Sequence, residues 1–341
     1  MKTLKVFYLV LALGIASIVI GEAVPAFQLS STNDKLRWIQ KEIYSDLPRK
    51  VDYAFIGSSH SWCAISARQI EAALPGKVVW NLGRNWVGRD LDAVIVRHLL
   101  SRHEVGHLIV EFDNPDMVGH HPYFQYFLSW EEMLDEWRYF MVDPGKIPFR
   151  YNLDPPATLS LFTTYVAQMA VRVPRGLMQE TIVRMRALNP LAQRAAVDDD
   201  STGGFLPRKR EESKIAPELE KAEMPDWSAK SRAVFPEGSL SHLYTLRIIR
   251  LAGQPRAELS FLFVPVYRGL LPSAEKVRFY RRMGRVLLPD LSGIYEAGGW
   301  FDTGHLNTAG AKIYTAALIR LLQHGEAASL YYQRYRSGGD E

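Results

Sequence analysis

Residues 51–59 of this chain read VDYAFIGSS, a short β-rich run that ends in a glycine and two serines. After this stretch the sequence alternates regularly between two patterns. Helical spacing occurs over residues 65–74 and 90–103, and strand-like runs occur over residues 77–82 and 108–112. Strands that alternate with helices predict a parallel sheet with helices on both faces, and short apolar strands fit such burial.

This alternation breaks at Pro115 and resumes near Leu240. Beyond the break, the pattern predicts helices over residues 243–251, 274–288 and 308–322, and strands over residues 259–264 and 292–296. The two halves together predict an α/β fold, a three-layer α/β/α domain of flavodoxin-like type with five parallel strands.

The break also predicts how the chain is organised. Residues 51–114 and 240–325 are expected to form the sheet-containing domain, and residues 115–239 a mostly helical inserted cap. Within the cap, residues 198–215 carry acidic, glycine and basic clusters typical of a mobile loop. Residues 326–341 are expected to be a C-terminal tail.

The N-terminal segment predicts export. Lys2 and Lys5 precede an apolar run over residues 6–20, which is typical of a signal peptide or a retained signal anchor within residues 1–27. The positive flank would stay inside, so the rest of the chain would lie outside the cytoplasm, attached to the membrane unless cleavage releases it. Residues 28–50 read as a tether with a short amphipathic helix.

Composition narrows the possible functions. The chain has 341 residues, of which 47% are hydrophobic, and its net charge of +4 is small and spread out. This balance does not indicate nucleic-acid binding, which usually requires a concentrated basic surface. The only cysteine, Cys63, excludes an intramolecular disulfide framework.

The first chemical signal is Ser59, which follows Gly57 and Ser58 at the end of the first predicted strand. A serine at a strand-to-helix turn can point its hydroxyl into a cleft, close to backbone N–H groups that stabilise a developing oxyanion. A glycine before it permits the tight turn. A serine in such a turn can equally be a helix N-cap, so this signal alone is weak.

The second signal is Asp302 with His305, just before the last predicted helix. A serine hydroxyl needs a base, histidine has a suitable pKa, and a carboxylate fixes the histidine tautomer. In open parallel sheets the site lies outside the carboxyl ends of the strands. The placement of Ser59 and of this loop therefore predicts that the three side chains meet there.

In these residues the chain resembles the SGNH/GDSL hydrolase superfamily. The first block of that family is Gly-Asp-Ser, matched by Gly57-Ser58-Ser59 with a serine at the aspartate position. Its last block is Asp-x-x-His, matched in spacing by Asp302 and His305. The resemblance implies that Ser59 is the nucleophile, His305 its base and Asp302 the group that orients His305.

The middle blocks of the family supply its oxyanion hole. The second block resembles the stretch after Asn81, where Gly88 is the preferred oxyanion glycine and Gly83 the rival. The third block is Gly-x-Asn-Asp, whose asparagine corresponds to Asn114, although Asn114 lies one place late and no glycine precedes it. The resemblance thus implies an oxyanion hole of Ser59, Gly88 and Asn114.

The resemblance covers about residues 50–114 and 240–325. A Gly-Ser-Ser block, an N-terminal anchor and a large insertion resemble the exported branch of the superfamily, which includes proteins that move or remove O-acetyl groups on polysaccharides. This implies serine-dependent acyl-ester hydrolysis or transfer on an envelope glycan, without a cofactor, with an acylated glycan or acyl donor as partner. The alternative is a non-catalytic envelope protein that binds a polysaccharide or an assembly partner.

A rival motif predicts zinc chemistry. Residues 103–107, with His103, Glu104 and His107, match the His-Glu-x-x-His pattern of zinc peptidases, and Glu131 or Glu132 could supply a third ligand. That chemistry requires both histidines on one face of a continuous helix. A glycine inside the motif and the apolar strand that follows favour a helix end instead, so this reading remains a remote alternative.

Four residues near the predicted site have less specific readings. His60 could line the cleft, although a capping or solvated histidine is the simpler reading, and Cys63 is expected to be a small buried thiol. Arg89 could touch the substrate, and Asp90 is favourable to the dipole of the helix it opens.

Overall fold

The computed structural model describes residues 34–45, 47–85, 88–112, 239–253, 257–291, 293–294 and 297–324, and isolated positions between 121 and 237. The predicted anchor, most of the cap with its loop at 198–215, and the tail lie outside the described residues. The chain divides into two compact units, residues 1–40 with 122–198 and residues 41–121 with 199–341, and the sheet belongs entirely to the second.

The sheet has five strands, all parallel. These are β1 (Lys50–Ile56), β2 (Val79–Asn81), β3 (Glu104–Glu111), β4 (Glu258–Leu262) and β5 (Arg285–Leu287). Their order across the sheet is β2-β1-β3-β4-β5, which is the flavodoxin-like order. The predicted α/β class is therefore confirmed.

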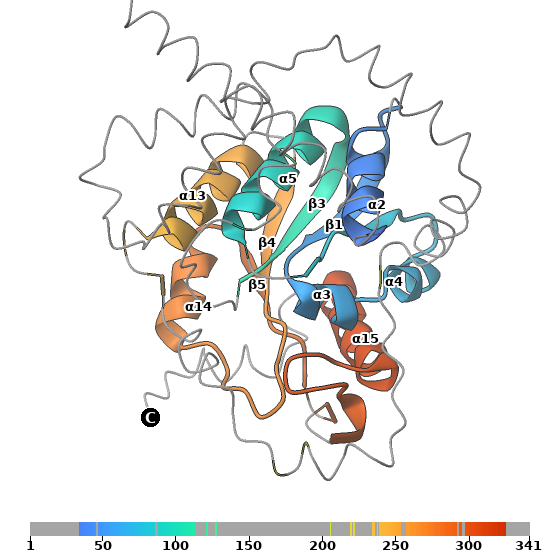
Figure 1. Cartoon of the computed structure of the whole chain (residues 1–341), viewed down its shortest axis with the longest axis vertical. Helices are drawn as coiled ribbons and strands as arrows, with labels where there is room; N and C mark the ends of the chain where they lie inside the picture. Colours follow the sequence, from blue (N-terminus) through green and yellow to red (C-terminus); the bar gives the residue numbers. More distant parts are fainter. Residues whose placement is uncertain are drawn as a thin grey trace, which may run out of the picture. The chain divides into compact units, whose positions relative to one another are not determined.

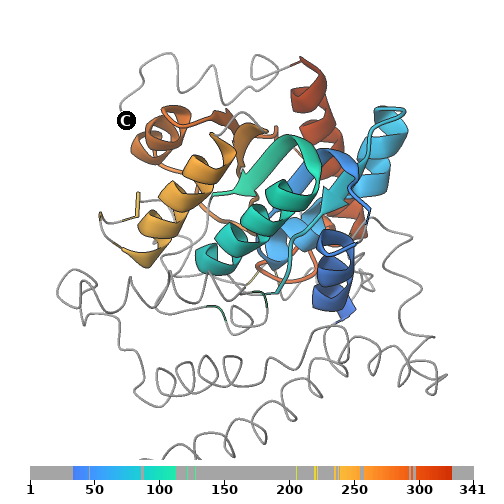
Figure 2. The same cartoon turned by 90° about the horizontal axis from the view of Figure 1, so that it is seen from above.

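Helices cover both faces of this sheet (Figure 1). On one face α5 (Arg89–Arg102) packs against α13 (Leu240–Ala252), and on the other α15 (Thr308–His324) packs against α3 (Ser59–Ala64) and α4 (Ala67–Ala73). Figure 2 shows the sheet between these two helical layers. The remaining described elements are α2 (Asp34–Ile43), α14 (Ala274–Arg281) and the 3-10 turn η3 (Ala297–Gly299).

The central strands are almost wholly buried. Residues 54–56 of β1 and 107–111 of β3 are all buried, and their registers place Ile56 beside Val110. Burial of each large apolar side chain in these two strands stabilises the fold by about 1.5–3 kcal/mol. The buried central strands therefore hold the carboxyl ends of β1 and β3 rigidly in place. The candidate site begins at these ends.

The fifth strand is not where the pattern predicts it. The helix expected over residues 274–288 ends at Arg281, residues 285–287 form β5, and residues 293–294 of the expected strand 292–296 lie in a turn. Gly284 explains the boundary, because a Cβ at that position would lie 2.7 Å from the carbonyl oxygen of Leu259. The close approach to β4 requires glycine, and the basic residues before it obscure the change from helix to strand.

The helix predicted over residues 65–74 forms as α4, and a further short helix, α3, lies between it and β1. The chain forms two short helices, α3 and α4, each preceded by a serine N-cap: Ser58 accepts a hydrogen bond from the N–H of His60, and Ser66 from the N–H of Gln69. Among the helices that the structure describes, none has the length and apolarity needed to cross a membrane.

Candidate active site

Ser59 is the first residue of α3, immediately after the turn that leaves β1. Gly57 and Ser58 form this turn, and Ser58 caps the helix with its hydroxyl. A Cβ at Gly57 would collide with the carboxylate of Glu111 and lie 2.5 Å from the hydroxyl oxygen of Ser61. Only glycine therefore lets the chain turn here, and the turn presents Ser59 at the carboxyl edge of the sheet.

The structure brings Ser59, His305 and Asp302 together. The Nε2 atom of His305 lies 2.8 Å from the Oγ atom of Ser59. The opposite ring nitrogen, Nδ1, lies 2.8 Å and 3.0 Å from the two carboxylate oxygens of Asp302. Both separations lie within the range required between a nucleophile, its base and the group that orients the base.

Hydrogen bonds within the loop that carries Asp302 and His305 hold the two residues in place. The Oδ1 atom of Asp302 accepts hydrogen bonds from the N–H groups of Gly304 and His305, each at 2.8 Å. Burial raises the pKa of Asp302, but the hydrogen bond and charge of His305 and the two N–H groups outweigh it and hold this pKa below its usual value. Asp302 is therefore ionised in the neutral range, as orienting the base requires.

The candidate oxyanion residues are described in part. Gly88 is the N-cap of α5, and a Cβ there would lie 2.6 Å from the ring of His121, so only glycine fits. The N–H of the rival, Gly83, already donates to the side chain of Asn81 at 3.0 Å. The choice of Gly88 as oxyanion donor therefore stays a prediction, and Asn114 lies outside the described residues.

Asn81, at the end of β2, binds the C-terminal end of α3. Its side-chain amide donates to the carbonyl oxygens of Ser61 and Ile65, at 3.0 Å and 2.8 Å. Its oxygen accepts from Gly83. The asparagine that the resemblance assigns to the second block thus ties β2 to α3 and to the loop that follows.

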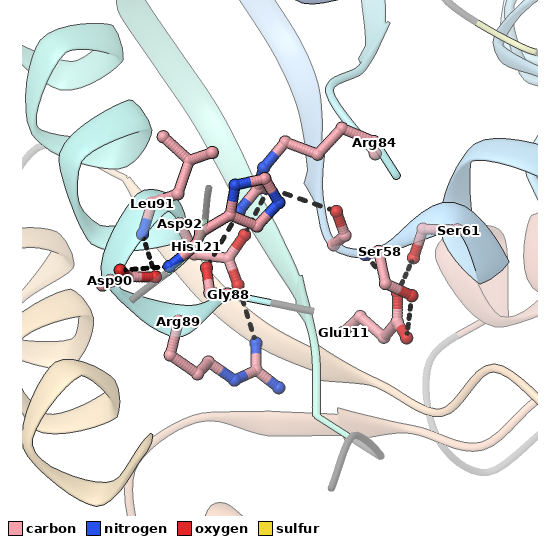
Figure 3. Close-up of polar contacts among 12 residues, drawn as sticks. Ser58, Ser61, Arg84, Gly88, Arg89, Asp90, Leu91, Asp92, Glu111 and His121 are labelled. Carbon is pink, nitrogen blue, oxygen red and sulfur yellow. Dashed lines mark hydrogen bonds and ion pairs between the residues drawn. The ribbon is translucent and has the colours of Figure 1, made fainter. Parts of the chain in front are cut away.

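One guanidinium joins the Ser59 turn to Gly88. Arg84 donates to the carbonyl oxygen of Gly57 at 3.2 Å and to that of Gly88 at 2.9 Å (Figure 3). Asp92 accepts from Arg84 at 2.6 Å and from Arg89 at 3.2 Å, and all three side chains are almost completely buried. Arg89 therefore pairs with Asp92 inside the protein, and this pairing takes the place of the expected contact with substrate.

Asp90 also acts inside the protein. Its carboxylate accepts from the N–H of Leu91 at 2.7 Å and from the N–H of His121 at 2.8 Å. The first-turn position agrees with the expected interaction with the helix N-terminus. By holding His121, Asp90 also places the ring that closes over Gly88.

Sequence reasoning missed Glu111, the last residue of β3. The side chain is completely buried beneath the Ser59 turn. Burial raises its pKa, but the nearby imidazole of His60, 3.6 Å away, and the hydrogen bonds from Ser61 and Ser58 lower it to about 2. An acidic residue directly after the apolar run of residues 108–110 was the signal that could have identified it.

The His-Glu-x-x-His motif does not form a metal-binding helix. The helix α5 ends at Arg102, and Glu104 starts β3. His103 accepts from the N–H of Arg49 at 3.1 Å and lies 3.0 Å from the carbonyl oxygen of Ile43, while His107 contacts Ser260. Within the described part of the chain, no three histidine, cysteine, aspartate or glutamate side chains cluster as metal ligands would. Glu131 and Glu132 lie outside that part.

The burial of His107 leads us to expect that the free energy of unfolding falls in acid. Burial in the sheet lowers its pKa to about 4, and Arg285 adds to this while Glu258 opposes it. The unfolded chain, in which the histidine pKa is about 6.5, binds the proton first as the pH falls. This contribution to stability is therefore complete above about pH 6.5 and is lost progressively towards about pH 4.

We expect the free energy of unfolding, measured with urea, to fall by roughly 2–3 kcal/mol between pH 7 and pH 4 because of His107. His107→Gln keeps a polar partner for Ser260 but has no proton to bind, so its profile should be flatter. Burial also lowers the pKa of His121 to about 4, so some slope should remain in this variant. Equal slopes in the two proteins would contradict the assignment.

Fold and site together define a class: an α/β protein that carries a hydrogen-bonded serine, histidine and aspartate at the carboxyl edge of its parallel sheet. No protein-family model matches the chain, and no curated protein matches it in sequence. The basis for assigning a function is therefore the geometry of this site.

Proposed function

We propose that the chain is a serine-dependent acyl-ester hydrolase or O-acyltransferase of SGNH type. The observation that carries this proposal is the line of hydrogen bonds from Ser59 through His305 to Asp302. A serine hydroxyl is a weak nucleophile unless a base removes its proton during attack. Here the base contacts the hydroxyl at 2.8 Å, and a carboxylate holds its other nitrogen.

In the first half of the reaction, Nε2 of His305 takes the proton from Ser59 while Oγ bonds to the acyl carbonyl carbon. The N–H groups of Ser59 and Gly88 stabilise the resulting oxyanion, with Asn114 as the third donor implied by the resemblance. His305 then protonates the leaving alcohol as its bond to carbon breaks. The acyl group remains on Ser59 as an ester.

In the second half, water or a sugar hydroxyl attacks this ester. His305 accepts the proton of the attacking group and returns it to Ser59 as the acyl bond to Oγ breaks. Asp302 stabilises the imidazolium in both halves. Water as acceptor gives hydrolysis, and a sugar hydroxyl gives transfer.

The proposed substrate is an acylated polysaccharide of the cell envelope, with acetyl as the acyl group. Support comes from the resemblance to the exported branch and from the basic and apolar N-terminal sequence, which is typical of an export signal or anchor. The alternative, a non-catalytic envelope protein, would not need Ser59 and His305 in contact. Their 2.8 Å separation supports catalysis over binding alone.

The test is labelling and turnover on the full chain, with a fluorophosphonate probe and p-nitrophenyl acetate. Wild type should label and release acetate, and Ser59→Ala should lose labelling and at least about 10³-fold in kcat, since the nucleophile is gone. Ser101→Ala, at an exposed serine in α5, is the matched control and should behave as wild type. Full labelling or turnover by Ser59→Ala would refute the proposal.

A further inference from the structure

Glu111 brings a buried carboxylate to the point where β1 and β3 end side by side. Its neighbour Val110 pairs with Ile56, the last residue of β1, so the side chain of Glu111 lies beneath the turn that follows. Figure 3 shows its oxygens directed at that turn. The side chain is 0% exposed.

Ser58 in the turn and Ser61 in α3 together donate three protons to this carboxylate. The N–H of Ser58 lies 2.8 Å from Oε2, the Ser58 hydroxyl 2.8 Å from Oε1, and the Ser61 hydroxyl 2.6 Å from Oε2. Ser58 and Ser61 flank Ser59 and His60 in sequence. The carboxylate thus anchors the chain on both sides of the nucleophile.

The same carboxylate reaches the base through a second histidine. The Nδ1 atom of His60 lies 3.6 Å from Oε1 of Glu111, and the ring of His60 meets that of His305 edge-on at 5.3 Å between centroids. Gly304 makes room for this contact, because a Cβ there would lie 3.3 Å from Nε2 of His60. The position of Glu111 therefore affects both partners of the Ser59–His305 hydrogen bond.

We propose that Glu111 is a positioning residue that aligns Ser59 with His305, acting through Ser58 and Ser61 on the nucleophile and through His60 on the base. This role rests on the proposed function of Ser59. A displacement of about 1 Å between reacting groups can lower a rate by about 10²-fold, so a carboxylate that never touches the substrate can still control turnover.

Glu111→Gln tests this with the least change of shape. Three protons, from the Ser58 N–H and the Ser58 and Ser61 hydroxyls, reach two carboxylate oxygens, whereas an amide accepts on one oxygen only, so at least one serine hydroxyl must turn away. We expect kcat on p-nitrophenyl acetate and the rate of fluorophosphonate labelling to fall by about 10- to 100-fold. KM should stay within about twofold, because ground-state binding is not altered.

The matched control is Glu104→Gln, the same substitution at the exposed opposite end of β3. It should keep wild-type rates. Ser61→Ala removes one of the three donors and serves as the second variant if Glu111→Gln does not fold. Its kcat should fall by about tenfold or less, again at constant KM. The double variant should lose less than the product of the two single losses, because both act on one network.

The outcomes separate the two proposals. A folded wild type that neither labels nor turns over overturns the proposed function, and the positioning role with it. A wild type that labels, together with folded Glu111→Gln at the wild-type rate, overturns the positioning role alone. Rate losses that come only with raised KM or a lowered unfolding temperature in both Glu111→Gln and Ser61→Ala would show a merely structural role and overturn it too.

Discussion

Asp302→Asn should lower kcat by about 10³- to 10⁴-fold with little change in KM, by analogy with the same exchange in a serine protease triad. The Asp302 carboxylate accepts from three donors: Nδ1 of His305 and the N–H groups of Gly304 and His305. An asparagine can keep the backbone contacts only by turning its oxygen towards them. Its NH2 group then faces Nδ1, which favours the tautomer that carries its proton on Nε2 and cannot accept one from Ser59.

The measurement is the pH profile of kcat for p-nitrophenyl acetate, together with an unfolding curve for each protein. Asp52→Asn is the matched control, because it makes the same change in an ion pair with the half-exposed Lys77 and should leave kcat unchanged. A kcat of Asp302→Asn within about threefold of wild type would show that Asp302 does not orient His305 for catalysis.

Asp92→Asn should lower the free energy of unfolding by about 3–5 kcal/mol, because it breaks a buried ion pair by removing one partner. Asp92 is the carboxylate that accepts from both Arg84 and Arg89, and the guanidinium groups are 1% and 2% exposed. Without its charge, two buried cations lose their common partner. The loss should also reach the candidate active site, since Arg84 donates to the carbonyl oxygens of Gly57 and Gly88.

Urea unfolding at pH 7 measures this loss, and kcat on p-nitrophenyl acetate measures its functional consequence. Asp52→Asn should cost less than about 1 kcal/mol, because its lysine partner keeps its solvation. Equal stabilities of the Asp92 and Asp52 variants would mean that the buried cluster contributes nothing beyond a surface pair.

Some residues of the candidate site could be predicted from the sequence alone. Ser59, Asp302 and His305 were predicted because each lies near the end of a strand pattern, and the carboxyl ends of parallel strands meet at one edge of a sheet. The structure places these three in contact, while their catalytic roles remain predictions. The sheet class and four of the five strand positions follow from the same alternation of periods.

Two failures have local causes. The fifth strand is three residues long and follows a basic helix. Three residues are too few to show an alternating pattern that differs from the helical period before them. Arg89 looked available to substrate because a charged residue at a helix start is usually solvated. The pairing with Asp92 is a local i,i+3 contact along α5, but the burial of both side chains is decided only when α5 packs in the folded domain.

The sequence by itself determined the alternation of strands and helices, the parallel sheet, and the positions at which Ser59, Asp302 and His305 meet. These properties follow from hydrophobic period and turn chemistry, which are local. Only the tertiary structure decided that Glu111 lies under the Ser59 turn and that Arg84 spans from Gly57 to Gly88. The physical reason is that buried charges are stable only with specific partners, and here strand register and helix packing bring Gly57 to Arg84 across 27 residues and Ser58 to Glu111 across 53.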